Sequence, residues 1–255
     1  MKKILILLIF IPLFLISCSK NSEEINISDD EISGIEEKMN NINNGEEDNT
    51  EKVKLVSDYS NDIEAINEFV DRFSKINKYK KIAKGITKTL INQDIDCYVS
   101  RDGNKYVIYN TSSSSYHEAI FDNKITYRND KDDEFKEINI SDYKKEYGVT
   151  PYDDTLFDYV INESTVSKIE RTIEDDKYTF TIDINVESDA TKYLKVQMKK
   201  LANVSEYPVF KSAKLSLTLN NDFTPISGHI DATYSIHYMF FDVDCEQSLD
   251  LSFEF

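Results

Sequence analysis

The sequence predicts an α+β fold that is mainly antiparallel β. Three long segments near the C-terminus alternate strictly between apolar and polar side chains, as strands with one buried face do. Short alternating segments before residue 140 are separated by turn residues such as Asp102 and Gly103, which indicates a meander of hairpins. Residues 62–76 carry apolar side chains at the helical period. A sheet with helices packed on it accounts for all three observations.

The N-terminal segment has the features of an export signal. Lys2 and Lys3 precede an apolar run at residues 4–16, which is shorter than the roughly twenty residues that a membrane span needs. An ordinary secretory signal favours a small residue three positions before its cleavage site, where Leu15 stands. Residues 15–18 (Leu-Ile-Ser-Cys) instead resemble the lipobox of bacterial lipoproteins. This resemblance implies cleavage after residue 17, acylation of Cys18 and a lipid-anchored position in the bacterial cell envelope, at the periplasmic face or the cell surface.

The next segment, residues 18–60, is expected to be an acidic tether. From residue 19 to residue 60 the chain has twelve acidic and four basic residues, and its first aromatic residue is Tyr59. Its scattered isoleucines are too few to cover a core, so we expect this segment to be disordered in water. The remaining residues, 61–255, are enough for a single β-rich domain.

The first part of this domain should be one helix followed by a meander. Asn61 or Ser60 is a suitable N-cap for the amphipathic segment at residues 62–76. Period-two alternation then predicts strands before and after the turn at Asp102 and Gly103. They are expected at residues 81–91, 95–100, 105–109, 116–121, 124–127 and 135–140.

A mixed segment follows the meander. Residues 141–147 are weakly helical, and Thr150 and Pro151 with two following aspartates are a typical helix start, so a second helix is expected at residues 150–161. A hairpin with its turn at Asp175 and Asp176 is expected at residues 166–186. Ser188 should cap a further helix that ends near Leu201.

The long C-terminal strands are expected at residues 213–219, 230–238 and 243–253. Their apolar stripes run the full length of each strand, so each strand needs a partner layer over one face. The sheet should therefore curl around helices or around a ligand.

Composition restricts the partners. The net charge is −17, and a strongly acidic surface repels nucleic acid, so we exclude nucleic acid as a partner.

Two cysteines besides Cys18 are present, Cys97 and Cys245. Their alternation with apolar neighbours places both thiols on the inner face, where a disulfide and two separate buried thiols remain equally open. A protein partner is not indicated by the sequence.

The order of these features resembles the LolA/LolB and LppX/LprG lipoprotein group over residues 61–255. The resemblance lies in a lipobox, an acidic tether, an N-terminal helix, a meander, a helical insert and long C-terminal hairpins. It implies a curved open sheet, or half-barrel, whose concave face is covered by the N-terminal helix and helical insertions and holds an apolar ligand such as a lipid or a lipoprotein acyl chain. The alternative is a structural or surface-interaction lipoprotein with a packed core and no ligand.

The candidate ligand contacts are aromatic residues on or near the apolar strand faces. They line a cavity if the half-barrel binds a ligand, and they fill a core if the protein has no ligand. They are Tyr106, Tyr178, Phe180, Tyr234, Tyr238, Phe240 and Phe253.

The sequence contains no constellation that indicates catalysis. His229 and His237 lie on one strand face, but eight strand residues separate them by roughly 26 Å, too far for a shared metal. The acidic loop at residues 129–134 lacks the pattern of a calcium-binding loop. We therefore expect a non-enzymatic protein without a cofactor or a metal site.

Overall fold

The computed structural model describes residues 25–44, 54–238 and 240–255. Its described strands form one antiparallel sheet in the order β6-β5-β4-β3-β2-β1-β11-β10-β9-β8-β7. The meander strands are β1 (Lys78–Lys88), β2 (Gln93–Asp102), β3 (Lys105–Ser112), β4 (Tyr116–Phe121), β5 (Ile125–Arg128) and β6 (Lys136–Ile138). The later strands are β7 (Val166–Glu174), β8 (Lys177–Ile184), β9 (Val209–Asn220), β10 (Pro225–Tyr238) and β11 (Phe241–Glu254).

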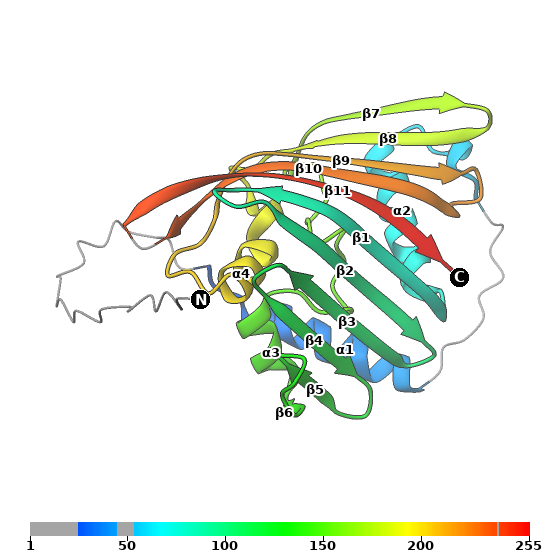
Figure 1. Ribbon diagram of the computed structural model, residues 1–255. Helices are drawn as coiled ribbons and strands as arrows, with labels where there is room; N and C mark the ends of the chain where they lie inside the picture. The colour runs from blue at the N-terminus through cyan, green and yellow to red at the C-terminus, as the bar shows by residue number, and fades with distance from the viewer. Residues whose placement is uncertain (1–24, 45–53, 239) are drawn as a thin grey trace, which may run out of the picture.

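The sheet is strongly curved and does not close, because β6 and β7 lie at opposite edges (Figure 1). The pairing of β1 with β11 joins the N-terminal meander to the C-terminal hairpins. Both expected hairpin turns are present: Gly103 and the pair Asp175 and Asp176 adopt the positive φ angles that tight hairpin turns require. The expected α+β fold with a curved open sheet is confirmed.

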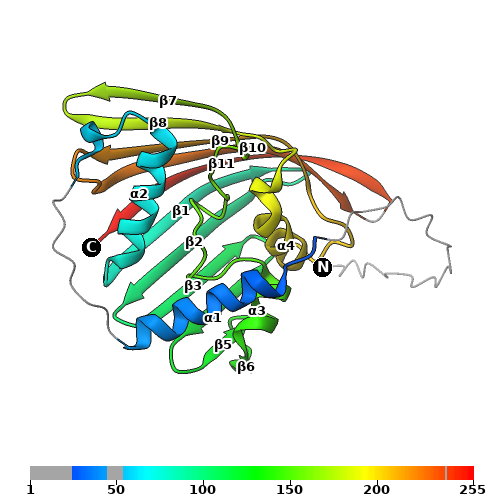
Figure 2. The same cartoon turned by 180° about the vertical axis from the view of Figure 1, so that it is seen from behind.

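The helices lie on the concave side of the sheet (Figure 2). They are α1 (Asp29–Asn44), α2 (Asp62–Lys75), α3 (Ile140–Tyr147) and α4 (Lys192–Leu201), with short 3-10 turns η1 (Val56–Asp58) and η2 (Asp189–Thr191). The expected cap of α2 is Asn61, whose side chain accepts hydrogen bonds from the backbone N–H groups of Ile63 and Glu64. Ser188 caps η2 in the same way, through the N–H of Ala190.

Two separate apolar clusters fill the space between the sheet and the helices. The large core joins α2, the segment at residues 149–165 and strands β8–β11, and its centre includes Ile66, Phe180 and Leu217. The small core joins α1 and α3 to β3–β5, around Tyr106, Phe121 and Tyr143. Burying each of these side chains stabilises the fold by about 1.5–3 kcal/mol, so the helices are held mainly through their apolar faces.

The expectation of a disordered tether is wrong for part of the segment. Residues 29–44 form α1, and Ile27, Ile32 and Ile35 are buried. These three isoleucines cannot form a core of their own, and Ile35 packs in the small core against the meander strands. Residues 54–58 are also placed, with the buried Val56 in the large core. Cys18 and the other tether residues lie outside the described part of the chain.

The expected helix at residues 150–161 is also wrong. The segment is an irregular loop in which Leu156 and Tyr159 form an isolated antiparallel bridge, and Phe157 and Asp158 between them have positive φ angles. The carboxylate of Asp153 accepts hydrogen bonds from both the N–H and the hydroxyl of Thr150. Thr150 and Asp153, which were expected to start a helix, instead close a local turn. Contacts of this segment with the rest of the fold outweigh its helix propensity. Smaller shifts occur elsewhere: β1 begins at Lys78 and ends before Leu90 and Ile91.

Candidate ligand-binding face

Helix α1 covers the concave surface of β3–β5. Ile35 belongs to the small core, and Met39 packs against that core from one turn further along the helix. The helix also contains Gly34 and four asparagines, which are poor helix formers. An isolated helix of this length and composition is marginal in water. Its stability therefore depends on contacts with the rest of the fold.

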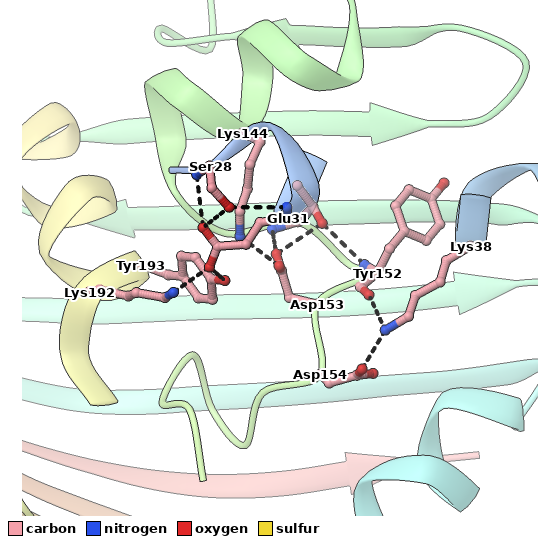
Figure 3. Close-up of polar contacts among 10 residues, drawn as sticks. Ser28, Glu31, Lys38, Lys144, Tyr152, Asp153, Asp154, Lys192 and Tyr193 are labelled. Carbon is pink, nitrogen blue, oxygen red and sulfur yellow. Dashed lines mark hydrogen bonds and ion pairs between the residues drawn. The ribbon is translucent and has the colours of Figure 1, made fainter. Parts of the chain in front are cut away.

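A set of polar contacts, which we call the latch, holds the start and the middle of α1 (Figure 3). Glu31 accepts a hydrogen bond of 2.6 Å from the hydroxyl of Tyr193 and forms an ion pair with Lys192. It also accepts a bond of 2.9 Å from the backbone N–H of Ser28, whose side chain caps the first turn in return. Lys38 on the same helix pairs with Asp154 of the loop. The latch thus ties α1 to α4 and to the 149–165 loop.

The electrostatics of Glu31 show that its ionised form is the one the latch holds. Burial by itself raises the pKa of this carboxyl, but hydrogen bonds from Lys192, Tyr193 and Ser28 outweigh it and lower the pKa to about 2. The latch is therefore intact at neutral pH and weakens in acid.

A buried ion pair between Lys144 and Asp153 packs against the latch residue Tyr193. Lys144 of α3 is completely buried and lies 2.6 Å from Asp153, which is nearly as buried. The ammonium also sits 3.3 Å from the centroid of the Tyr193 ring, a cation–π contact. Burial lowers the pKa of Lys144, and the charge of Asp153 opposes that shift. Tyr193 thus connects this pair to Glu31.

An open groove of about 770 Å³ runs beside α1, between this helix and the β5–β6 edge of the sheet. Its lining mixes apolar and polar side chains. They are Glu36, Met39, Asn40, Lys124, Ile125, Glu137, Ile138, Asn139, Ile140 and Asp142. The groove gives access to the margin of the small core at Ile125 and Ile140.

The two cores are separated by a polar seam at the centre of the concave face, where the 149–165 loop crosses β1 and β2 (Figure 2). Lys81 on β1 lies 5.2 Å from the centroid of Phe157 in this loop. Burial lowers the pKa of Lys81 and raises that of Asp158, and each charge opposes the shift of the other. On β3, the buried amide nitrogen of Asn110 has no hydrogen-bond partner. The seam therefore contains Lys81 and Asp158, and β3 carries an unused buried donor at Asn110.

The structure separates the seven predicted ligand contacts into three groups. Tyr106 is buried in the small core, and Tyr178, Phe180 and Tyr234 are buried in the large core. Phe253 is partly buried against Phe73 and Phe157.

The remaining two predicted contacts, Tyr238 and Phe240, are exposed at the β10–β11 turn. Their assignment to a cavity lining is wrong, because the hairpin extends past the helices that cover the concave face (Figure 1).

The two cysteines of the domain are free thiols. Cys97 is cross-strand partner to Ala83 on β1, whereas Cys245 is partner to Tyr234 on β10. Cys245 is buried and Cys97 is half-buried, and burial raises their pKa values to about 11 and about 12. The alternative of a disulfide is therefore excluded in this structure.

The structure also reveals a histidine cluster on β10 and β11 that sequence reasoning missed. The Nδ1 atom of His229 lies 2.8 Å from Asp250, and its Nε2 atom lies 3.2 Å from both Ser248 and Asp231. Cross-strand register between β10 and β11 brings these residues together, and register is not visible in the sequence.

This arrangement is unsuited to acyl transfer. Ser248 lies on a strand that is paired on both sides, with β1 and with β10, so its backbone has no free donor for an oxyanion. Asp231 competes for the nitrogen that a catalytic serine would use. Within the described residues, no group of three or more histidine, cysteine, aspartate or glutamate side chains is arranged to hold a metal ion.

None of the helices in the described residues is both long enough and apolar enough to span a bilayer. Comparison with protein-family models and with curated proteins gave no match to this sequence.

Proposed function

We propose that this chain is a membrane-anchored, non-enzymatic lipoprotein that binds an apolar ligand, a lipid or a lipoprotein acyl chain, on the concave face beneath α1. The observation that supports this proposal most is the way α1 covers the wall of β3–β5. A few apolar side chains and a polar latch hold the helix there, and an open groove borders it. The anchor is the acylated Cys18 that the lipobox-like residues 15–18 imply.

The free energy gained by burying the apolar side chains of α1 is comparable to the free energy gained by burying an acyl chain in their place. Ile35 and Met39, the side chains of α1 that pack in or against the small core, contribute about 3–6 kcal/mol in total at 1.5–3 kcal/mol each. An acyl chain that buries about eight to ten methylene groups on the same wall gains about 6–8 kcal/mol. The apolar contacts of an acyl chain can therefore offset those of α1, and breaking the latch is the remaining cost of releasing the helix. The polar seam offers Lys81, and β3 offers Asn110, to the head of such a ligand.

The test is the lipid content of the purified full-length protein and its uptake of a fluorescent fatty acid. We expect a co-purified acyl lipid on extraction and mass spectrometry, and saturable uptake after delipidation. Ala119→Leu adds bulk to the wall under α1, and Ala213→Leu adds the same bulk to the large core. Both substitutions overpack a core, but only Ala119→Leu should reduce uptake. Absence of bound lipid together with absence of uptake contradicts the proposal.

A second candidate function is a structural or surface-interaction lipoprotein without a ligand. The complete burial of Phe180 and Leu217 favours it, because these side chains pack against other apolar side chains in the large core. Protease treatment of intact cells tests this candidate. A surface role requires that the domain be cleaved, and complete protection of the domain rules that role out.

A further inference from the structure

Large apolar side chains are exposed at one end of the sheet. Leu90 and Ile91 occupy the β1–β2 turn and are 75% and 77% exposed. At the β10–β11 turn, Phe240 is 84% exposed, and Tyr238 and Phe241 are about half exposed. Since β11 pairs with β1 from Glu246 to Glu254, the two turns lie at the same end of the sheet (Figure 1). Exposed apolar groups concentrated in this way typically mark an interaction surface.

The charged residues next to the β10–β11 turn are paired. Asp242 contacts His237 at 2.9 Å, and Asp244 forms an ion pair with Lys211. Glu246 lies 3.7 Å from Lys88 at the end of β1. Lysines therefore compensate two of these three carboxylates, Asp244 and Glu246, beside the exposed apolar side chains, although the protein as a whole has a net charge of −17. Such a surface suits an electrically neutral apolar partner better than a charged one.

The start of α1 lies at this same end of the molecule, as both views of the ribbon show (Figures 1 and 2). Cys18 precedes residue 25, the first described residue, by seven positions. Seven residues span at most about 25 Å, even when fully extended. Because α1 packs on the meander, acyl chains on Cys18 would hold this end of the protein, and not the opposite one, near a bilayer.

We propose that the β1–β2 and β10–β11 turns form a membrane-contacting surface that inserts Leu90, Ile91, Phe240 and Phe241 into the interface of a zwitterionic bilayer. This inference rests on the proposed anchoring through Cys18 and adds a second attachment to it. Phenylalanine and leucine side chains are typical of protein faces that bury into the boundary between headgroups and acyl chains. Attachment at two points would fix the orientation of the domain, with the β7–β8 turn pointing away from the membrane.

The absence of tryptophan from the sequence makes a direct test available, because one introduced tryptophan is the only indole in the protein. Phe240→Trp and Leu90→Trp place it in the proposed surface. Ile173→Trp is the matched control, since Ile173 is 63% exposed beside the β7–β8 turn at the opposite end. Each full-length lipidated variant is reconstituted into phosphatidylcholine vesicles, with and without bromine on the acyl chains.

We expect the brominated lipid to quench most of the fluorescence of Phe240→Trp and Leu90→Trp, and to leave that of Ile173→Trp unchanged. Equal quenching in all three variants, or none in the first two, overturns the proposed orientation. Flotation of the same samples and the mass of the N-terminal peptide separate this outcome from a failure of the anchor. A protein without acyl chains on Cys18 overturns both proposals, whereas a lipidated, floating protein with unquenched indoles overturns only this one.

Discussion

Replacement of Glu31 by glutamine should release α1 without unfolding the domain. The carboxyl pKa falls from 4.5 to about 2, which corresponds to about 3 kcal/mol at 1.36 kcal/mol per unit. A quarter of the side chain remains exposed, so solvent screening reduces the expected loss to about 2 kcal/mol. This is about a thirtyfold increase in the open population of α1. Glu37→Gln is the control, because Glu37 is exposed on the same helix.

Hydrogen exchange of the α1 amides at neutral pH measures this effect directly. We expect protection in α1 to fall about thirtyfold in Glu31→Gln, because the latch loses about 2 kcal/mol, and to stay unchanged in Glu37→Gln. Because the pKa of Glu31 is lowered, its stabilising contribution is complete above pH 4.5 and is lost as the pH falls toward 2. The difference between wild type and Glu31→Gln should therefore vanish in that window. Equal protection at neutral pH would refute the assignment of Glu31 to the latch.

Three further substitutions or reactions test the supports of the fold. Lys144→Met leaves Asp153 buried without its cation and should cost about 3–5 kcal/mol, measured as a shift in the urea midpoint; a loss below about 1 kcal/mol would contradict the burial of this pair. Gly148→Ala places a methyl group 2.3 Å from the carbonyl oxygen of Tyr193 at a positive φ angle and should lower stability by at least about 2 kcal/mol; an unchanged melting temperature would contradict this. Cys245, with its pKa raised to about 11, should react with a maleimide at pH 7 only upon unfolding, and rapid labelling of the native protein would show that it is exposed.

The parts of the fold that depend on local pattern could be predicted from the sequence. The alternation in residues 213–219 and 230–238 corresponds to β9 and β10, because one buried strand face imposes period two. Turn residues also predicted two hairpins correctly, because Gly103 and the two aspartates of the β7–β8 turn adopt the positive φ angles that such turns need. The N-cap residue Asn61 fixed the start of α2.

The features that depend on tertiary contacts could not be predicted. The isoleucines at positions 27, 32 and 35 look isolated in sequence but are buried in the fold, and Ile35 packs in the small core with side chains of the meander. Thr150 and Asp153 have the spacing of a helix start, but Asp153 forms an ion pair with Lys144 of α3. In the latch, Glu31 contacts Lys192 and Tyr193, which are more than 160 positions away in the sequence. Tyr238 and Phe240 were misassigned because strand alternation does not reveal how far the hairpin extends past the helices.

The most direct test of the central claim is the affinity of Glu31→Gln for a fluorescent fatty acid, compared with wild type and with Glu37→Gln. If α1 must leave the concave face before an acyl chain enters, the apparent Kd equals the intrinsic Kd divided by the small fraction of protein in which α1 is released. Glu31→Gln should then bind more tightly than wild type, by up to the thirtyfold factor that its loss of about 2 kcal/mol implies, and Glu37→Gln should bind like wild type. An unchanged or weaker affinity in Glu31→Gln would contradict the account, because it would mean that ligand and helix do not compete for the same wall.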